Sequence, residues 1–284
     1  MNKLLFLALT AGCGATWAQT PATNPMPDGS RDMYVGLGVQ SAPRFEGAGS
    51  RKVSALPVLQ VEWSSGLFIS GLTAGMHLSD RPTVEYGPLV AVYPGRDEAG
   101  AGTQIGGVGV TEFAHGIPSP INRSKLQGDR LSGMDEIGAR LEVGAFANYY
   151  LAPRWRLTSS LLLGSGKERD GARLELGVQR LAAVANARHR VSVSAGMSLV
   201  NRQYNQSYFG VSEDESMRSR FPLYRAGGGL KDVHAGARWN WSLSPSWMLT
   251  SDVQVERLLG SANKSPLVER STNVTVSTAI AYRF

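Results

Sequence analysis

Apolar and polar residues alternate with a period of two along most of the chain. Successive side chains of a β-strand point to opposite faces, so such a segment has one apolar and one polar face. Segment 273–284 shows this best, with an apolar face made of Val274, Val276, Thr278, Ile280, Tyr282 and Phe284. The pattern predicts strands that place one face in hydrocarbon and the other in water.

The alternation predicts about twelve strands. Several run ten residues or more, whereas strands of soluble sandwiches most often have about five to six. We therefore expect an all-β fold, a transmembrane antiparallel β-barrel, rather than a soluble β-sandwich. The expected strands lie near 33–40, 53–63, 66–75, 84–93, 103–112, 136–149, 155–165, 173–183, 190–199, 232–243, 247–256 and 273–284. The least regular is 103–112, which three glycines weaken.

The connections between these strands alternate between short and long. Bacterial barrels have short periplasmic turns and longer extracellular loops, and an even strand number places both chain ends in the periplasm. A nine-residue turn at 94–102 departs from this rhythm. The short turns are 64–65, 151–154, 184–187 and 244–246, and the long links are 41–52, 76–83, 113–136, 166–172, 201–229 and 258–272.

The N-terminus has the features of an export signal. Lys3 precedes a short apolar run at 4–11, and small residues stand where a signal peptidase cleaves. We predict a cleaved signal peptide at 1–18, a flexible periplasmic N-terminal segment at 19–32 and the barrel at 33–284.

Composition narrows the class further. Cys13 is the single cysteine and would leave with the signal peptide, so no disulfide or thiol chemistry is expected. Its alternative role as a lipidation site is disfavoured because Thr10 stands where a large aliphatic residue is usual. The chain has no run of 18 apolar residues, which excludes helical membrane spans. The net charge of +6 is mild, and export excludes nucleic acid as a partner.

Residues suited to catalysis are few. Of the four histidines, His77, His115 and His189 fall in or beside loops and His234 on a lumen face; none has a second histidine at metal-ligand spacing. Ser261 and Lys264 match an S-x-x-K pattern, but without the accompanying helix and motifs. We expect no catalytic residue, cofactor or metal, and keep a hydrolase using His234 or Ser261 as a remote alternative.

Charged residues on the predicted lumen faces carry both signs in similar number. A mildly selective pore and a lumen braced by ion pairs are both compatible with this, and the balance of signs favours bracing. The residues are Glu136, Arg140, Glu142, Arg156, Glu175, Arg190, Arg238, Asp252, Glu256 and Arg283.

Two further groups of residues are candidates for recognition. The terminal aromatic pattern of Ile280, Tyr282 and Phe284 is similar to the signal that barrel-insertion machinery reads. Loop 201–229 is unusually aromatic, which suggests a binding surface or a plug, with loop self-packing as the alternative. Its candidate residues are Tyr204, Tyr208, Phe209, Phe221, Tyr224 and Arg225.

An ordered set of short motifs resembles the MipA/OmpV family of outer-membrane proteins over nearly the whole exported chain. The motifs lie at 42–47, 56–57, 86–88, 95–96, 207–211, 222–232, 258–262, 265–268 and 282–284, of which 207–211 (SYFGV) and 222–232 (PLYRAGGGLKD) are the most distinctive. Arg44 and Phe45 depart from the family's more usual start.

The resemblance implies a scaffold that bridges a periplasmic lytic transglycosylase and a murein synthase, with adhesin or permeability factor as the alternative. It implies no catalytic residue. The other expected partners are outer-membrane lipid, including lipopolysaccharide, and the barrel-insertion machinery. Because the distinctive motifs fall in outer loops while murein enzymes are periplasmic, we expect the loops to plug the barrel and 19–32 with the short turns to meet the partner.

Overall fold

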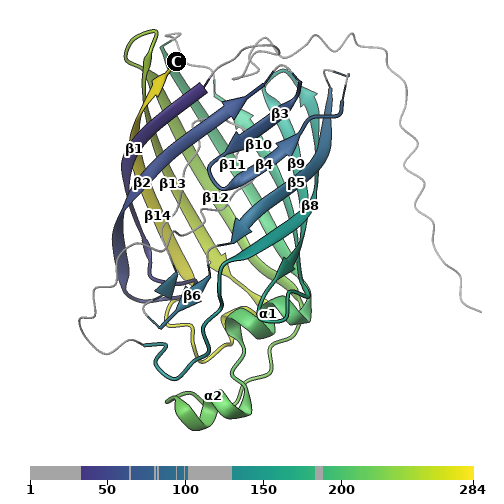
Figure 1. Cartoon of the computed structure of the whole chain (residues 1–284), viewed down its shortest axis with the longest axis vertical. Helices are drawn as coiled ribbons and strands as arrows, with labels where there is room; N and C mark the ends of the chain where they lie inside the picture. The colour runs from purple at the N-terminus through teal and green to yellow at the C-terminus, as the bar shows by residue number, and fades with distance from the viewer. Residues whose placement is uncertain are drawn as a thin grey trace, which may run out of the picture.

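The chain forms a closed, twelve-stranded antiparallel β-barrel (Figure 1). The structure, a computed structural model, describes residues 33–63, 65–79, 81, 83–93, 95–98, 100–101, 130–182 and 188–284. The predicted signal peptide and N-terminal segment lie outside these residues. No helix in the described ranges is long and apolar enough to cross a membrane.

Each barrel strand pairs with its two neighbours in chain order, and the first strand pairs with the last. The barrel strands are β1 (Met33–Pro43), β2 (Arg51–Glu62), β3 (Leu67–Ser70), β4 (Thr73–Met76), β5 (Val84–Tyr93), β8 (Arg140–Ala152), β9 (Trp155–Ser165), β10 (Gly171–Leu181), β11 (His189–Val200), β12 (Gly229–Ser242), β13 (Trp247–Leu258) and β14 (Thr272–Arg283). Outside the wall lie β6 (Arg96–Asp97), β7 (Gly100–Ala101), α1 (Arg202–Phe209), α2 (Glu213–Arg218) and α3 (Gly260–Asn263).

The apolar and polar residues that alternate in the sequence form the outer and inner faces of the barrel wall. On β1, Val35, Leu37 and Val39 point outward and are 48%, 60% and 59% exposed, while Tyr34 and Gln40 point into the lumen and are buried. Outward aliphatic residues recur on every long strand. So large an apolar surface is stable only against hydrocarbon, so the predicted class of fold, a transmembrane barrel, is confirmed.

Segment 66–75, predicted as one strand, is instead a short hairpin of β3 and β4. Its turn contains Gly71, whose φ of 59° lies in the left-handed region that glycine adopts without strain. The turn is fixed on both sides, because Gly71 N donates to Leu59 O at 2.8 Å and Val92 N donates to Leu72 O at 3.0 Å. In segment 66–75, where the alternation is weak, Gly71 thus lies at a turn that reverses the direction of the chain.

The strand predicted at 103–112 lies outside the described residues. In the barrel, β5 pairs directly with β8 over ten residue pairs, from Val84–Tyr149 to Tyr93–Arg140. The expected number of strands is therefore right, but the split of 66–75 supplies the twelfth wall strand.

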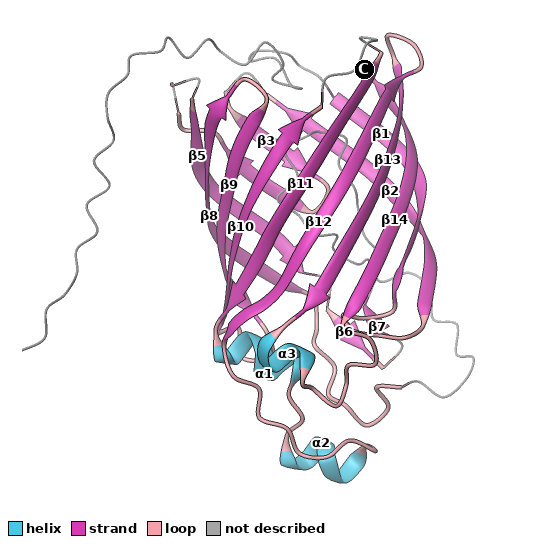
Figure 2. Ribbon diagram, turned by 180° about the vertical axis from the view of Figure 1, so that it is seen from behind, coloured by secondary structure: helices cyan, strands magenta, loops and turns pink. Residues whose placement is uncertain are grey.

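The two ends of the barrel differ (Figure 2). One end, here called the short-turn end, has tight connections such as Pro153–Arg154 and 243–246, and the other, the loop end, carries the long connections and all three helices. Two connections were assigned to the wrong end. The link after β4 leads to Val84 at the short-turn end, and residues 95–98, which follow β5, lie at the loop end. Both errors follow from treating β3 and β4 as one strand.

The β1–β14 closure depends on small residues. Gly38 faces Ala279 across this pairing, and a Cβ at Gly38 would lie closer to Ala279 Cβ and Thr278 O than atoms can approach. A Cβ at Gly236 in β12, by contrast, would meet its nearest atoms, Ser194 Oγ and Val253 O, at 3.3 Å.

We therefore expect Gly38→Ala to destabilise the barrel by about 1–3 kcal/mol, the usual cost of overpacking. Gly236→Ala, the matched control, should cost clearly less. The measurement is the temperature at which the folded, fast-migrating form disappears in SDS gel electrophoresis. Equal midpoints for the two variants would contradict this account of the closure.

Candidate functional site: a capped and ion-paired lumen

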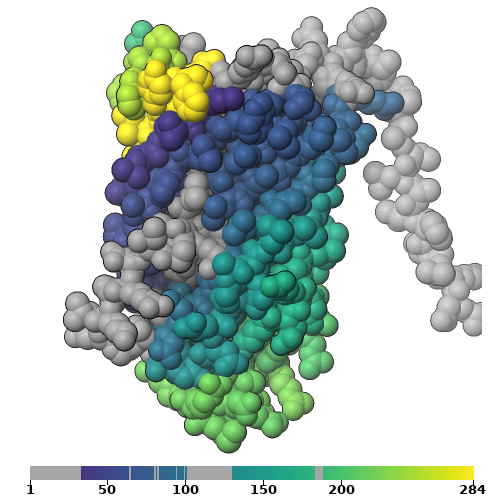
Figure 3. Space-filling model, in the orientation of Figure 1, coloured from purple at the N-terminus to yellow at the C-terminus, as the bar shows by residue number. Residues whose placement is uncertain are grey.

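Loops at the loop end fold over the mouth of the barrel, and we call them the cap. The cap comprises residues 44–50, 95–98, 130–139, 166–170, 201–228 and 259–271. In Figures 1 and 2, α1 and α3 lie directly at this mouth and α2 lies further out. In the space-filling view the green segment that follows β11 covers this end on the face shown (Figure 3).

The side chain of Asn201 fixes the start of α1. Its Oδ1 accepts hydrogen bonds from Tyr204 N at 2.9 Å and Ala172 N at 3.0 Å, and its Nδ2 donates to Asp170 O at 2.8 Å. Asparagine is a favoured N-cap residue because its side chain satisfies an amide that the helix leaves free. One residue therefore both starts α1 and ties it to the β9–β10 loop.

A first hydrophobic core lies beneath α1. Tyr204 and Phe209 are each 1% exposed, and they pack with Leu258, Ala262 and Ile137 from three other parts of the chain. Tyr208 joins this core; its hydroxyl accepts a hydrogen bond from Gly166 N at 3.2 Å. Burial raises the pKa of Tyr208 to about 12, so the hydroxyl stays neutral.

A second core lies on the outer side of the cap. It joins the β1–β2 loop, the segment before β8, the chain around α2 and the β13–β14 loop, and Tyr224 packs against both cores. Its buried members are Phe45, Ala48, Leu131, Met134, Val211, Phe221 and Leu267. The cap is thus a packed unit with its own hydrophobic interior.

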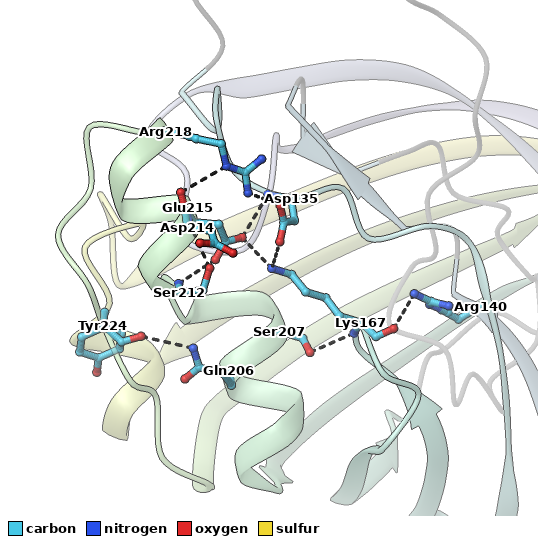
Figure 4. A network of polar contacts seen from close by, with 10 residues as sticks. All are labelled: Asp135, Arg140, Lys167, Gln206, Ser207, Ser212, Asp214, Glu215, Arg218 and Tyr224. Carbon is cyan, nitrogen blue, oxygen red and sulfur yellow. Dashed lines mark hydrogen bonds and ion pairs between the residues drawn. The ribbon is translucent and has the colours of Figure 1, made fainter.

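Four charged residues hold α2 to the rest of the cap, and we call them the ionic latch: Asp135, Lys167, Glu215 and Arg218 (Figure 4). Lys167 Nζ donates to Glu215 Oε1 at 2.6 Å and to Asp135 Oδ2 at 3.0 Å. Arg218 donates to Asp135 Oδ1 at 2.7 Å. Ser212 and Glu215 also form the capping box that starts α2.

Both latch carboxylates are held in the charged form. Hydrogen bonds from Arg218 and Lys167 lower the pKa of Asp135. Burial alone would raise the pKa of Glu215, but hydrogen bonds from Lys167 and from the Ser212 and Asp135 amides lower it overall. The Glu215 side chain is 2% exposed, so its pairing with Lys167 is the best shielded part of the latch.

Below the cap, the buried side chain of Lys231 contacts carboxylates from three elements. Lys231 Nζ lies 3.0 Å from Glu46 in the β1–β2 loop, 3.0 Å from Asp232 and 3.8 Å from Glu256 on β13. Asp232 also contacts His234 Nδ1 at 2.9 Å. These ion pairs connect the cap to the wall.

A β-bulge brings Lys231 into the lumen. Ser198 pairs with Asp232 but Leu199 pairs with Leu230, so Lys231 is an extra residue on β12. Lys231 and Asp232, although adjacent, both point inward and are 2% and 0% exposed. Strict alternation would have placed Lys231 outside, which is why the sequence did not identify it.

Further ion pairs lie along the inner face of the wall. Arg173 NH2 lies 3.3 Å from Glu142 Oε2, and Arg173 Nε lies 3.7 Å from Glu175 Oε1. Ser198 Oγ donates to Glu175 at 2.8 Å. Arg238 on β12 pairs with Asp252 on β13 at 3.5 Å.

The lumen near the short-turn end has its own polar network. Glu85 accepts hydrogen bonds from Tyr150 at 2.6 Å and Asn148 at 3.0 Å. Arg156 pairs with Glu85 at 3.5 Å and donates to Gln179 at 2.5 Å. Four strands, β5, β8, β9 and β10, are thereby linked across their inner faces.

The predicted lumen charges occupy several environments. Glu142, Arg156, Glu175, Arg238, Asp252 and Glu256 take part in the pairs above. Arg140 lies at the mouth and donates to Lys167 O at 2.7 Å. Arg190 and Arg283 are exposed near the short-turn end. Glu136 was misplaced: β8 begins only at Arg140, and Glu136 is exposed in the cap.

The loop candidates divide in a similar way. Tyr204, Tyr208, Phe209 and Phe221 are buried in the two cores, and Tyr224 is partly buried. Arg225 remains exposed and lies 3.7 Å from Glu213. Ile280 and Tyr282 point outward on β14, Phe284 directly follows this strand, and all three are at least 40% exposed. Their role in barrel insertion stays a prediction.

The catalytic alternatives have no supporting geometry in the described residues. Ser261 donates to Gly227 O and accepts from Asn205 Nδ2 at 3.1 Å, so it joins α3 to the cap. His234 is engaged with Asp232 beside the Lys231 cluster. No group of three metal-binding side chains occurs in the ranges that the structure describes.

Fold and site together define a β-barrel protein of the outer membrane with a capped lumen. A family model described as "MltA-interacting protein MipA" matches residues 35–284. The chain therefore belongs to the MipA family, as the motifs indicated.

Two outer-membrane proteins resemble part of the chain. Over 90 residues it is 31% identical to Omp26La of Vibrio anguillarum and 30% identical to OmpV of Vibrio cholerae serotype O1. The matches cover 32% of this chain and 34% of each relative, so the chain spans about a third of the length of the curated relatives it matches.

Solved barrels are similar at low identity. The NanC porin matches at a TM-score of 0.45 and 7% identity, covering 89% of this chain and 100% of that one. The outer-membrane channel DcaP of Acinetobacter baumannii matches at 0.38 and 8%, covering 89% and 96%. At these scores the likeness supports no conclusion about transport.

The lowered pKa values of Asp135 and Glu215 predict that acid releases α2. The latch stabilises the cap fully above the ordinary carboxyl values of 3.8 and 4.5, and loses this contribution as the pH falls through the lowered values. Hydrogen exchange at α2, corrected for intrinsic rates, should therefore rise between about pH 5 and about pH 3.

At neutral pH, Glu215→Gln should raise exchange at α2 about tenfold or more, because it removes a charge-assisted hydrogen bond. Glu213→Gln is the matched control on the same helix, since Glu213 is exposed and makes only the long contact to Arg225. Unchanged exchange in Glu215→Gln would show that the latch does not hold α2.

Proposed function

We propose that this protein is a non-enzymatic scaffold of the outer membrane that binds a murein-remodelling enzyme on the periplasmic side. The observation that carries the proposal is that side chains of the chain itself occupy the mouth of the barrel and line its lumen. Packed cores occupy the mouth, and the charges of the lumen wall are joined in ion pairs. An interior filled in this way suits a rigid platform better than a conduit.

The family's most distinctive motifs serve this interior. In 207–211, Tyr208, Phe209 and Val211 are buried in the two cores. In 222–232, Lys231 and Asp232 form the charged cluster below the cap. These motifs therefore build the closed barrel, which leaves the partner surface elsewhere.

The partner surface in this proposal comprises the short turns and the segment 19–32. The description "MltA-interacting protein" supports a lytic transglycosylase as the partner. A murein synthase bound at the same side would complete the bridge that the family resemblance implies. In this proposal the short-turn end, where β1 begins and β14 ends, faces the periplasm, because bacterial barrels have their short turns on that side.

A purified lytic transglycosylase from the same organism should bind the detergent-solubilised full-length protein. Deleting residues 20–32 should weaken this binding at least about tenfold, the loss expected when a major contact is removed. Surface plasmon resonance with the barrel immobilised measures it.

The matched control is Met217→Ala with Arg225→Ala, two exposed cap residues on the opposite end. It should bind as tightly as the wild type. If the folded full-length protein binds neither a lytic transglycosylase nor a murein synthase, or if only the cap variant loses binding, the scaffold proposal fails.

A small pore is the second candidate, and the charged lumen lining is the observation that favours it. The ion pairs of the lumen wall argue against it, because they leave few charges available to a permeant ion. The cap argues against it as well, because it lies over the mouth of the barrel. In planar bilayers we expect no discrete conductance steps from the wild type under conditions where a known porin conducts. Reproducible unitary steps that a Glu142→Gln variant alters would instead establish the pore.

A further inference from the structure

The lipid-facing surface differs between its two ends. At the short-turn end it carries a belt of aromatic side chains, among them stacked His189, Trp239 and Trp241 and the paired Trp247 and Tyr282. All tryptophans of the described residues lie at this end: Trp63, Trp155, Trp239, Trp241 and Trp247. Such belts mark the headgroup level of a phospholipid leaflet.

The loop end has no outward aromatic side chain on the described strands. The outward positions there are mostly aliphatic or small and polar, and two of them are arginines, Arg51 on β2 and Arg257 on β13. Arg270, in the loop between β13 and β14, is also exposed. We call these three residues the arginine rim.

The arginine rim lies around the start of β14. Arg257 pairs in register with Thr272, two residues beyond Arg270. Arg51 reaches across β1 to β14, where its NH1 donates to Val274 O at 2.6 Å. Its NH2 and Nε also donate to Ser41 O and Oγ at 2.8 and 3.1 Å. The strands β13, β14, β1 and β2 are consecutive neighbours in the wall (Figure 2).

No ion pair within the described part of the chain involves the arginine rim. The neighbouring carboxylate, Glu269, is directed elsewhere: it pairs with Arg130 at 2.9 Å and accepts from Gly49 N at 2.7 Å. Arginine on the lipid face is costly at depth and cheap near the interface. Arg51 makes hydrogen bonds to Ser41 and Val274 O, but none of the three guanidinium groups has a carboxylate partner among the described residues. Their positive charge is therefore available to an anionic partner outside the chain.

We propose that the arginine rim binds the phosphate groups of a phosphorylated glycolipid in the outer leaflet. Guanidinium groups bind phosphate oxygens in pairs of parallel hydrogen bonds, which suits phosphomonoesters carried on a sugar headgroup. The acyl chains would lie on the aliphatic strip below the rim, where Val255, Val274 and Val276 are about 40% exposed. This inference is independent of the proposed scaffold function.

Another lipid-facing arginine supplies a matched control. Arg180 is outward on β10 at the short-turn end, and its guanidinium lies 5.2 Å from the Trp155 ring centroid. It therefore has an aromatic partner within the wall, unlike the rim arginines. The test compares Arg257→Gln with Arg270→Gln in one double variant against Arg180→Gln. Arg51 is left intact because its hydrogen bonds also join β2 to β14.

The experiment titrates purified lipid A into the detergent-solubilised full-length protein and follows lipid adducts by native mass spectrometry. The wild type and Arg180→Gln should bind lipid A equally. The double variant should bind it about tenfold or more weakly, since it loses charge-assisted hydrogen bonds. Dephosphorylated lipid A, phosphatidylglycerol and inorganic phosphate, added separately, distinguish the glycolipid phosphate from other sources.

The proposal is supported if lipid A binds at least tenfold more tightly than all three comparison ligands and only the double variant loses it. Equal binding of lipid A by the double variant and the wild type would overturn it. So would equal binding of dephosphorylated lipid A, phosphatidylglycerol or inorganic phosphate by the wild type. The melting temperature without lipid, unchanged in the double variant, shows that the wall is intact.

Discussion

The structure depends on one requirement, that every backbone amide and carbonyl in hydrocarbon has a partner. A sheet meets it only by closing on itself, because an open edge would leave peptide groups unpaired in lipid. The β1–β14 pairing provides that closure. The alternation of side chains follows from placing this closed sheet between hydrocarbon and a polar lumen, and the even strand number follows from its antiparallel closure.

Closure creates a second problem, a polar interior that burial makes costly unless its charges are paired. This chain resolves it with opposite charges from different strands. Lys231 contacts three carboxylates and Arg173 contacts two, while the cap packs its own hydrophobic cores at the mouth. Segments 207–211 and 222–232 lie where the cap meets the lumen, so these loop residues serve packing and ion pairing.

The sequence predicted the barrel because period-two alternation is local and survives in single strands such as β14 and β8. The alternation could not predict features in which a single residue interrupts the period of two. Gly71 turns a predicted strand into a hairpin, and the bulge at Lys231 moves a charge from outside to inside. The alternation also could not predict which charged residues pair, because Glu46 and Lys231 are far apart in the sequence and meet only in the folded chain. Two helices of the cap do have sequence signals, the N-cap residue Asn201 and the Ser212–Glu215 capping box. The strand pattern alone does not reveal them.

Because β1 pairs with β14, the barrel can close only after the last strand has been synthesised. The register that joins Val35 to Tyr282 brings together the two extremes of the wall. A chain truncated anywhere before its last strand would present two open edges to the bilayer, and only a full-length product leaves the assembly pathway without an exposed template for aggregation.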